Sequence, residues 1–120
     1  MKKVLTIIIA ISLFSCNTKK NVKADYDLNK NEEFQISLKA NHTTGFSWKW
    51  IKSESSQLVD TVSVNYIPKK VNGEIVGSGG NEIWKFKANV IGIDTLKFEY
   101  QQPWQPNSTV ETKKIIIKIN

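Results

Sequence analysis

Apolar side chains alternate with polar ones along much of this chain, a period of two that is typical of half-buried β-strands. The pattern is clearest in the windows 33–39, 82–90 and 96–100. The positions expected to face the core are Phe34, Ile36 and Leu38; Trp84, Phe86, Ala88 and Val90; and Leu96, Phe98 and Tyr100. These windows predict three strands, each with one face toward a shared apolar core.

Other strands are expected at 45–51, 58–66 and 112–119, and a short extra strand near 24–28. Phe46, Trp48 and Trp50 alternate in the first of these windows, whereas Ile116 breaks the alternation in the last. No window shows a convincing helical period. Six or seven short strands within about a hundred residues indicate an all-β fold, an antiparallel sandwich or barrel.

Five connections join these strands, at 40–45, 52–57, 67–81, 91–94 and 101–109. Antiparallel strands cross a domain from end to end, so the first, third and fifth connections should share one end. Those three have unusual contents, "NHTTG", "GSGG" and "QQPWQPNS", while the other two are short and ordinary. One end of the domain is therefore expected to collect three distinctive loops, as binding loops collect in immunoglobulin variable domains.

Each motif alone has an ordinary interpretation. The polar run before Phe46 can be simple turn chemistry, with Asn41 or Thr44 bonding nearby backbone. Four small residues at 77–80 can form a flexible turn, and Trp104 can fold back on the core. Only their combination and order are specific.

In that combination the chain resembles the chagasin family of cysteine protease inhibitors. That family carries N-P-T-T-G-[FY], G-x-G-G and R-P-W motifs in this order on an immunoglobulin-like sandwich. Here they stand as "NHTTGF" (41–46, the threonine loop), "GSGG" (77–80, the glycine segment) and "QPW" (102–104, the tryptophan loop). The resemblance spans roughly residues 24–120, and it implies an immunoglobulin-like antiparallel β-sandwich of about seven strands.

The resemblance also implies a function, reversible inhibition of papain-like cysteine proteases by loops that occlude the active-site groove. The threonine loop would enter the groove, the glycine segment would lie along its wall, and the tryptophan would be a rigid anchor. The residues expected to bind the protease are Asn41, His42, Thr43, Thr44, Gly45, Phe46, Gly77, Ser78, Gly79, Gly80, Gln102, Pro103 and Trp104.

Two positions depart from the family motifs. His42 replaces a proline, which should raise the entropy lost on binding, and Gln102 replaces an arginine, which removes a charged fork. His42 could instead be a metal ligand or a catalytic base. The chain has one histidine, however, and no acidic cluster flanks it in the sequence, so neither role is favoured.

The N-terminus indicates export. Lys2 and Lys3 precede an apolar run from Val4 to Phe14, which is too short to span a bilayer, and "LFSC" closes it with the chain's one cysteine. This pattern resembles a bacterial lipoprotein signal, although Phe14 is unusual there, and simple secretion is the alternative. We therefore expect a signal peptide at 1–15, a lipidated Cys16, a tether at 16–23 and an inhibitor domain at 24–120. The protein would be anchored in the bacterial cell envelope, on the periplasmic or surface face.

Composition and charge mainly exclude other classes of function. The formal charge is +6, or +4 without Lys2 and Lys3, and no basic run interleaved with aromatics suggests nucleic acid. The sequence shows no grouping of Ser, His and Asp, no phosphate-binding loop and no metal-ligand spacing, so we expect a protein that is not an enzyme and needs no cofactor or metal. We also expect it to be a monomer. The rival hypotheses are an envelope-anchored adhesion or glycan-binding sandwich, with Trp104 and Tyr66 stacking on sugar, and an accessory subunit of an envelope complex.

Overall fold

The computed structural model describes residues 23–52 and 57–120. The expected signal peptide, Cys16 and the tether as far as residue 22 lie outside these described residues, as does most of the connection between the third and fourth strands. Within the described residues no helix is long and apolar enough to cross a membrane.

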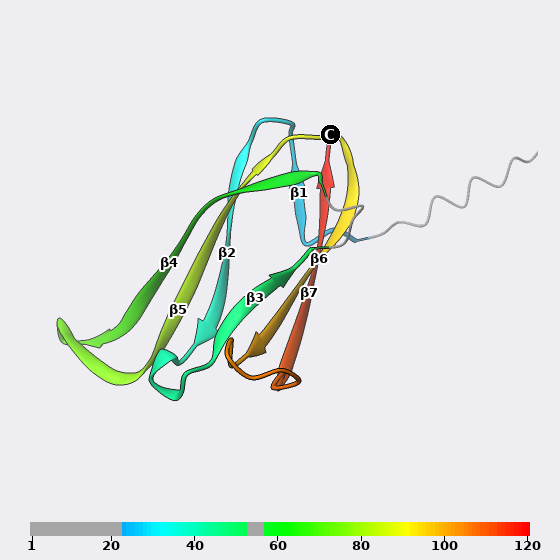
Figure 1. The fold of residues 1–120 in the computed structure, drawn as a ribbon. Coiled ribbons are helices and arrows are strands. Elements are labelled where there is room, and N and C mark those ends of the chain that lie inside the picture. Colours follow the sequence, from blue (N-terminus) through cyan, green and yellow to red (C-terminus); the bar gives the residue numbers. More distant parts are fainter. Residues whose placement is uncertain (1–22, 53–56) are drawn as a thin grey trace, which may run out of the picture.

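Two β-sheets pack face to face in the described part of the chain (Figure 1). One sheet has the order β1-β7-β6-β3 and the other the order β2-β5-β4. All neighbouring strands are antiparallel except β1 and β7, which are parallel. The strands are β1 (Tyr26–Leu28), β2 (Glu33–Ala40), β3 (Ser47–Ile51), β4 (Val59–Val71), β5 (Glu74–Ala88), β6 (Gly92–Gln101) and β7 (Glu111–Ile119). The expected seven-stranded β-sandwich is thereby confirmed.

The core is built from the alternating positions that the sequence indicates. Ile36, Leu38 and Phe86 on the three-stranded sheet are at most 1% exposed, and so are Leu96 and Phe98 on the other sheet. One expected core position is wrong. Val90 is 47% exposed, because β5 ends at Ala88 and the chain then turns toward β6.

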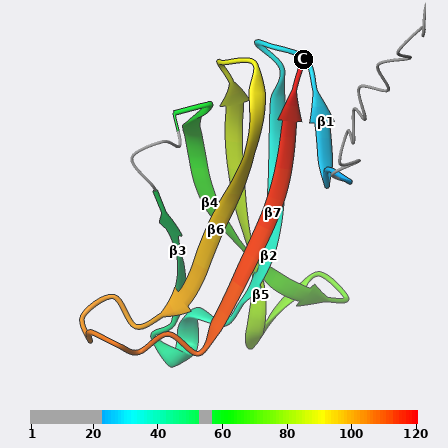
Figure 2. The same cartoon turned by 90° about the vertical axis from the view of Figure 1, so that its right-hand side faces the viewer.

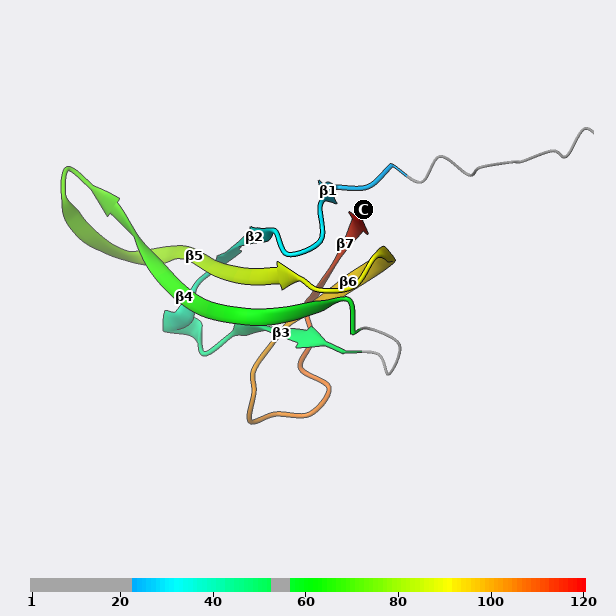
Figure 3. The same cartoon turned by 90° about the horizontal axis from the view of Figure 1, so that it is seen from above.

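The third connection also differs from expectation. It is not a long loop, because β4 and β5 continue past the expected strand ends and form one long hairpin. The hairpin turns at Asn72 and Gly73, both with positive φ (52° and 82°), as the favoured two-residue hairpin turns require. Seen from above, it projects well beyond the rest of the sandwich (Figure 3). Pro68 is tolerated in β4 because this is an edge strand, with a register shift between Pro68 and Lys70.

The expected clustering of connections is confirmed. The turn after β2, the tip of the β4–β5 hairpin and the β6–β7 loop lie at the same end of the molecule (Figure 2). The two sheets therefore bring all three motif regions to one end, although residues 77–80 lie in a strand that leads to the hairpin tip.

Candidate functional site

The threonine loop is a short 3₁₀ turn, η1 (His42–Thr44), that Asn41 caps. The Asn41 side-chain oxygen accepts hydrogen bonds from the backbone N–H and the hydroxyl of Thr43. The Thr44 hydroxyl donates to the Asn41 carbonyl at 2.7 Å. Gly45 ends the turn in the left-handed region (φ 82°) that glycine adopts without strain. Both threonine side chains are exposed, but their hydroxyl hydrogens are used inside the loop, which leaves lone pairs and methyl groups for a partner.

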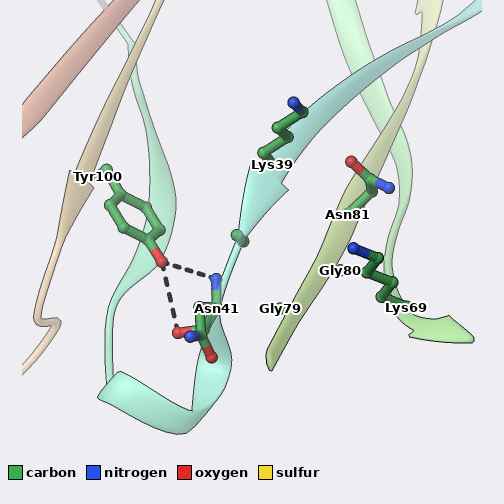
Figure 4. Close-up of a pocket in the computed structure, with 8 residues that line it drawn as sticks. Lys39, Asn41, Lys69, Gly79, Gly80, Asn81 and Tyr100 are labelled. Atoms are coloured by element: carbon green, nitrogen blue, oxygen red, sulfur yellow. Dashed lines mark hydrogen bonds between the residues drawn. The ribbon is translucent and has the colours of Figure 1, made fainter. Parts of the chain in front are cut away.

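The base of this loop is fixed to the four-stranded sheet through Tyr100. The Tyr100 hydroxyl accepts the backbone N–H of Asn41 at 2.8 Å (Figure 4). Phe46 and Trp48 both pack on the Tyr100 ring, with ring centroids 5.4 and 5.0 Å away. Trp48 is 6% exposed, which confirms its expected place in the core.

His42 joins the same loop to the three-stranded sheet. Its Nε2 lies 3.0 Å from a carboxylate oxygen of Glu82, a residue of β5 that is 3% exposed. Its ring stacks on Tyr66 of β4, with centroids 3.9 Å apart and planes 17° from parallel. One face of Tyr66 is therefore covered, which disfavours the sugar-stacking role considered for that ring. Within the described residues no cluster of three His, Cys, Asp or Glu side chains could hold a metal ion.

The glycine segment lies in β5 rather than in a loop, which corrects the expectation from the sequence. Gly80 pairs with Ala40 of β2 on one side and with Pro68 of β4 on the other. A Cβ at Gly80 would lie 2.9 Å from the Pro68 Cα and still closer to the Ile67 carbonyl oxygen, so only glycine fits there. Gly77 and Ser78 belong to the same strand.

The pairing of β2 with β5 stops at Ala40 and Gly80. From Gly79 (φ 94°) back to Glu74, no strand of the described residues therefore pairs with the β5 backbone on its β2 side. A hollow of about 630 Å³ lies at this point, between the end of β2 and the β4–β5 hairpin. Its lining includes Lys39, Asn41, Lys69, Gly79, Asn81 and Tyr100 (Figure 4).

The tryptophan loop closes the other side of the site. Its backbone is held by Ser108, whose hydroxyl accepts the N–H of Gln102 at 2.9 Å and donates to the carbonyl of Gln105 at 2.7 Å. Trp104 is 68% exposed, as expected for a loop residue outside the core. Its ring lies over Gly45, because a Cβ there would be 3.0 Å from the indole Cζ2 and still closer to Cη2. Pro103 is exposed and Gln102 is half-buried beside it.

The structure thus brings the three motifs together through specific contacts. Sequence reasoning missed the residues that make two of these contacts, Glu82 and Tyr100, as well as the stacking of Tyr66 on His42. For Glu82 a signal existed, because it falls on the same face of its strand as Trp84 and Phe86 and is a charged residue at an inward position. The alternation places Tyr100 correctly on the inward face, but it does not indicate that the hydroxyl binds Asn41.

Comparison with known proteins gives a consistent result. Residues 27–119 match the family described as chagasin family peptidase inhibitor I42. Chagasin from Trypanosoma cruzi is 27% identical over 107 residues, which cover 86% of this chain and 96% of chagasin.

Two solved structures have a similar fold. The cysteine protease inhibitor EhICP2 from Entamoeba histolytica has a TM-score of 0.65 at 18% identity and covers 80% of this chain and 88% of its own. PbICP-C, solved in complex with falcipain-2, has a TM-score of 0.54 at 17% identity and covers 78% of this chain and 84% of its own. Because the family match spans most of the chain, this protein belongs to the chagasin family of peptidase inhibitors and is not an enzyme.

Proposed function

We propose that this domain inhibits papain-like cysteine proteases reversibly, by placing residues 41–46, 77–80 and 102–104 in and beside the active-site groove. The observation that carries the proposal is that the threonine loop is held against both β5 and the tryptophan loop at one end of a stiff sandwich. His42 meets Glu82 of β5, and Trp104 lies on Gly45. A partner would meet one pre-ordered surface, so little conformational entropy is lost on docking.

The threonine loop suits a narrow groove because its exposed residues are small and its conformation is held from inside. Its backbone is not extended, since His42–Thr44 form a 3₁₀ turn and Gly45 is left-handed. It would therefore fill the groove without presenting a strand-like segment for cleavage. The loop also offers no thiol or other group for covalent trapping, so we expect the complex to dissociate with both proteins intact.

The glycine segment supports a second mode of contact. In the part of the chain that the structure describes, no strand lies on the β2 side of β5 from Glu74 to Gly79. The N–H and C=O groups of this backbone can therefore pair with an extended segment of the enzyme. The hollow beside Gly79, rimmed by Lys39 and Lys69, leaves room for side chains of that segment.

Trp104 supplies the anchor on the opposite side. A large, rigid and exposed aromatic ring is the type of residue that dominates protein interfaces. Gln102 offers a neutral donor and acceptor where the family motif has arginine, so we expect the tryptophan loop to bind mainly through Trp104.

Titration of papain with the purified chain tests this proposal. We expect stoichiometric, reversible loss of activity. Trp104→Ala should weaken inhibition about 30-fold, the equivalent of a ~2 kcal/mol hot spot, mainly through faster dissociation. Ile91→Ala is the matched control, because Ile91 is 64% exposed and lies in the β5–β6 turn, away from the motifs. Absence of inhibition of several such enzymes, or rapid cleavage within 41–46, would contradict the proposal.

We further propose that residues 1–15 are a signal peptide and that the chain is held in a bacterial envelope by a lipid on Cys16. The support is the basic start, the apolar run and the "LFSC" ending, together with a family match that begins only at residue 27. Residues 16–23 would then tether the domain 24–120 to the membrane. Mass spectrometry of the native protein should find lipid on Cys16, and Cys16→Ser should release the chain from membranes. An unmodified soluble chain that begins elsewhere would refute the anchor.

A further inference from the structure

We propose that Glu82 is a positioning residue for inhibition: through His42, and together with Tyr66, it clamps the threonine loop to the three-stranded sheet. This inference rests on the proposed function, because the loop it holds is the one assigned to the protease groove. The clamp would do by noncovalent contact what a proline ring at position 42 would do by covalent restraint.

The geometry places His42 between two fixed groups. Its Nε2 lies 3.0 Å from Oε2 of Glu82, and its ring is stacked on Tyr66 with centroids 3.9 Å apart. Both partners belong to the long β4–β5 hairpin, whereas His42 begins the turn after β2. A histidine held on one edge by a hydrogen bond and on one face by an aromatic ring has little freedom left about its side-chain torsions.

The carboxylate of Glu82 is itself fixed by the core. Oε2 also accepts the backbone N–H of Trp48 at 3.0 Å, and Oε1 accepts the indole N–H of Trp84 at 3.2 Å. A carboxylate that is 3% exposed is costly unless its oxygens are hydrogen-bonded, so these donors are part of its stability. Both core partners of Glu82 are N–H groups that can only donate, so each of its carboxylate oxygens accepts a hydrogen bond from the sandwich. Two of the three bonds come from the sandwich and the third comes from the loop, which ties the position of the loop to the core.

The clamp explains how the loop tolerates His42. Proline restricts its own φ, whereas histidine leaves the backbone and its side chain free in an isolated turn. Without another restraint, the loop would lose more entropy on docking, and the affinity would fall. Glu82 and Tyr66 supply this restraint before the protease arrives.

A double-mutant cycle measured by papain inhibition tests the clamp in the full-length chain. His42→Ala and Glu82→Gln should each weaken inhibition about tenfold, and the double variant should be no weaker than the worse single variant, because both remove one contact. In the H42P background, Glu82→Gln should change inhibition less than about twofold, since the ring then supplies the restraint. Glu33→Gln is the control, because Glu33 pairs with Lys85 on the exposed surface of the same sheet.

Melting temperatures separate positioning from folding. Glu82→Gln should lower the melting temperature in both the parent and the H42P background, because the core donors Trp48 and Trp84 lose part of their acceptor in either case. A loss of inhibition that is equally large in the two backgrounds would overturn the proposal and leave Glu82 with a structural role alone.

Amide hydrogen exchange gives a readout that needs no protease. The N–H groups of Thr44 and Gly45 bond to the carbonyls of Asn41 and His42, so they report how well the turn is held. Exchange at these amides should quicken about tenfold in His42→Ala and Glu82→Gln. It should not quicken when Glu82→Gln is added to H42P. If the parent chain fails to inhibit papain while the exchange pattern holds, the proposed function is wrong and the clamp stands; unchanged exchange in Glu82→Gln refutes the clamp.

Discussion

Gly45→Ala should damage this protein more than the same change at Gly73, although both glycines have φ of 82°. The shared left-handed conformation costs a non-glycine residue roughly 1–2 kcal/mol. At Gly73 nothing lies within 4 Å of an added Cβ, so this cost stands alone. At Gly45 the Cβ would lie 3.0 Å from Cζ2 of Trp104 and closer still to Cη2, so the indole has to move.

The size of the additional loss follows from the exposure of Trp104. The side chain is 68% exposed, so about a third of its surface is covered. A tryptophan buries on the order of 150–250 Å² when fully enclosed, so the covered part amounts to ~50–80 Å². At about 25 cal/mol per Å², displacing the ring costs ~1–2 kcal/mol at most. We therefore expect a total destabilisation of ~2–4 kcal/mol for Gly45→Ala and ~1–2 kcal/mol for Gly73→Ala.

Thermal melts of four variants decide the matter: the two glycine variants, Trp104→Ala, and the double variant at Gly45 and Trp104. Gly45→Ala should melt at least ~4 °C below Gly73→Ala. In the W104A background, Gly45→Ala should cost only the backbone term, because the obstructing ring is gone. Inhibition should fall about 30-fold for Gly45→Ala and less than about twofold for Gly73→Ala. Equal melting temperatures for the two glycine variants, or an undiminished cost in the W104A background, would refute the placement of Trp104 on Gly45.

Three further changes probe the scaffold beneath the loops. Trp48→Ala should cost ~3–5 kcal/mol of stability as a core truncation, and any folded fraction should inhibit nearly normally. A variant with the melting temperature of the parent chain would place Trp48 outside the core. Gly80→Ala should lower the melting temperature by more than 10 °C, since its Cβ would collide with backbone of β4 at Ile67; a shift under about 2 °C would contradict the pairing on both sides of β5. Tyr100→Phe removes the acceptor of the Asn41 N–H and should weaken inhibition about fivefold, with dissociation kinetics as the measurement; an unchanged rate would show that this bond does not hold the loop.

The strands were predictable because alternation reports directly which face of a strand is buried. Ile36 and Leu38 on β2, and Leu96 and Phe98 on β6, lie in the core as their spacing indicates. The strand ends were less predictable. The alternation in the sequence continues to Val90, but β5 ends at Ala88.

The largest difference between sequence and structure concerns residues 67–81, whose glycines indicate a loop but which mostly lie in β4 and β5. The dipeptide Asn72–Gly73 carried the correct signal, because Asn-Gly between strand-like segments favours a two-residue hairpin turn. Gly80 is present for another reason, the close approach of β4, and composition alone does not distinguish a glycine in a turn from a glycine under a neighbouring strand. The contacts of Glu82 and Tyr100 with the threonine loop depend on which strands become neighbours, which a single sequence does not specify.

The separation along the chain of the residues that hold the site has a kinetic consequence. Asn41 and Tyr100 are 59 residues apart, and His42 and Glu82 are 40 apart, whereas the β4–β5 hairpin forms between adjacent segments. Local hairpins form within ~1–10 μs, but contacts between distant segments require most of the chain to be in place. During refolding, protection of the hairpin amides should therefore precede the recovery of inhibitory activity. A chain with all its strands but with the two sheets not yet docked would be inactive, so inhibition itself marks the completion of folding.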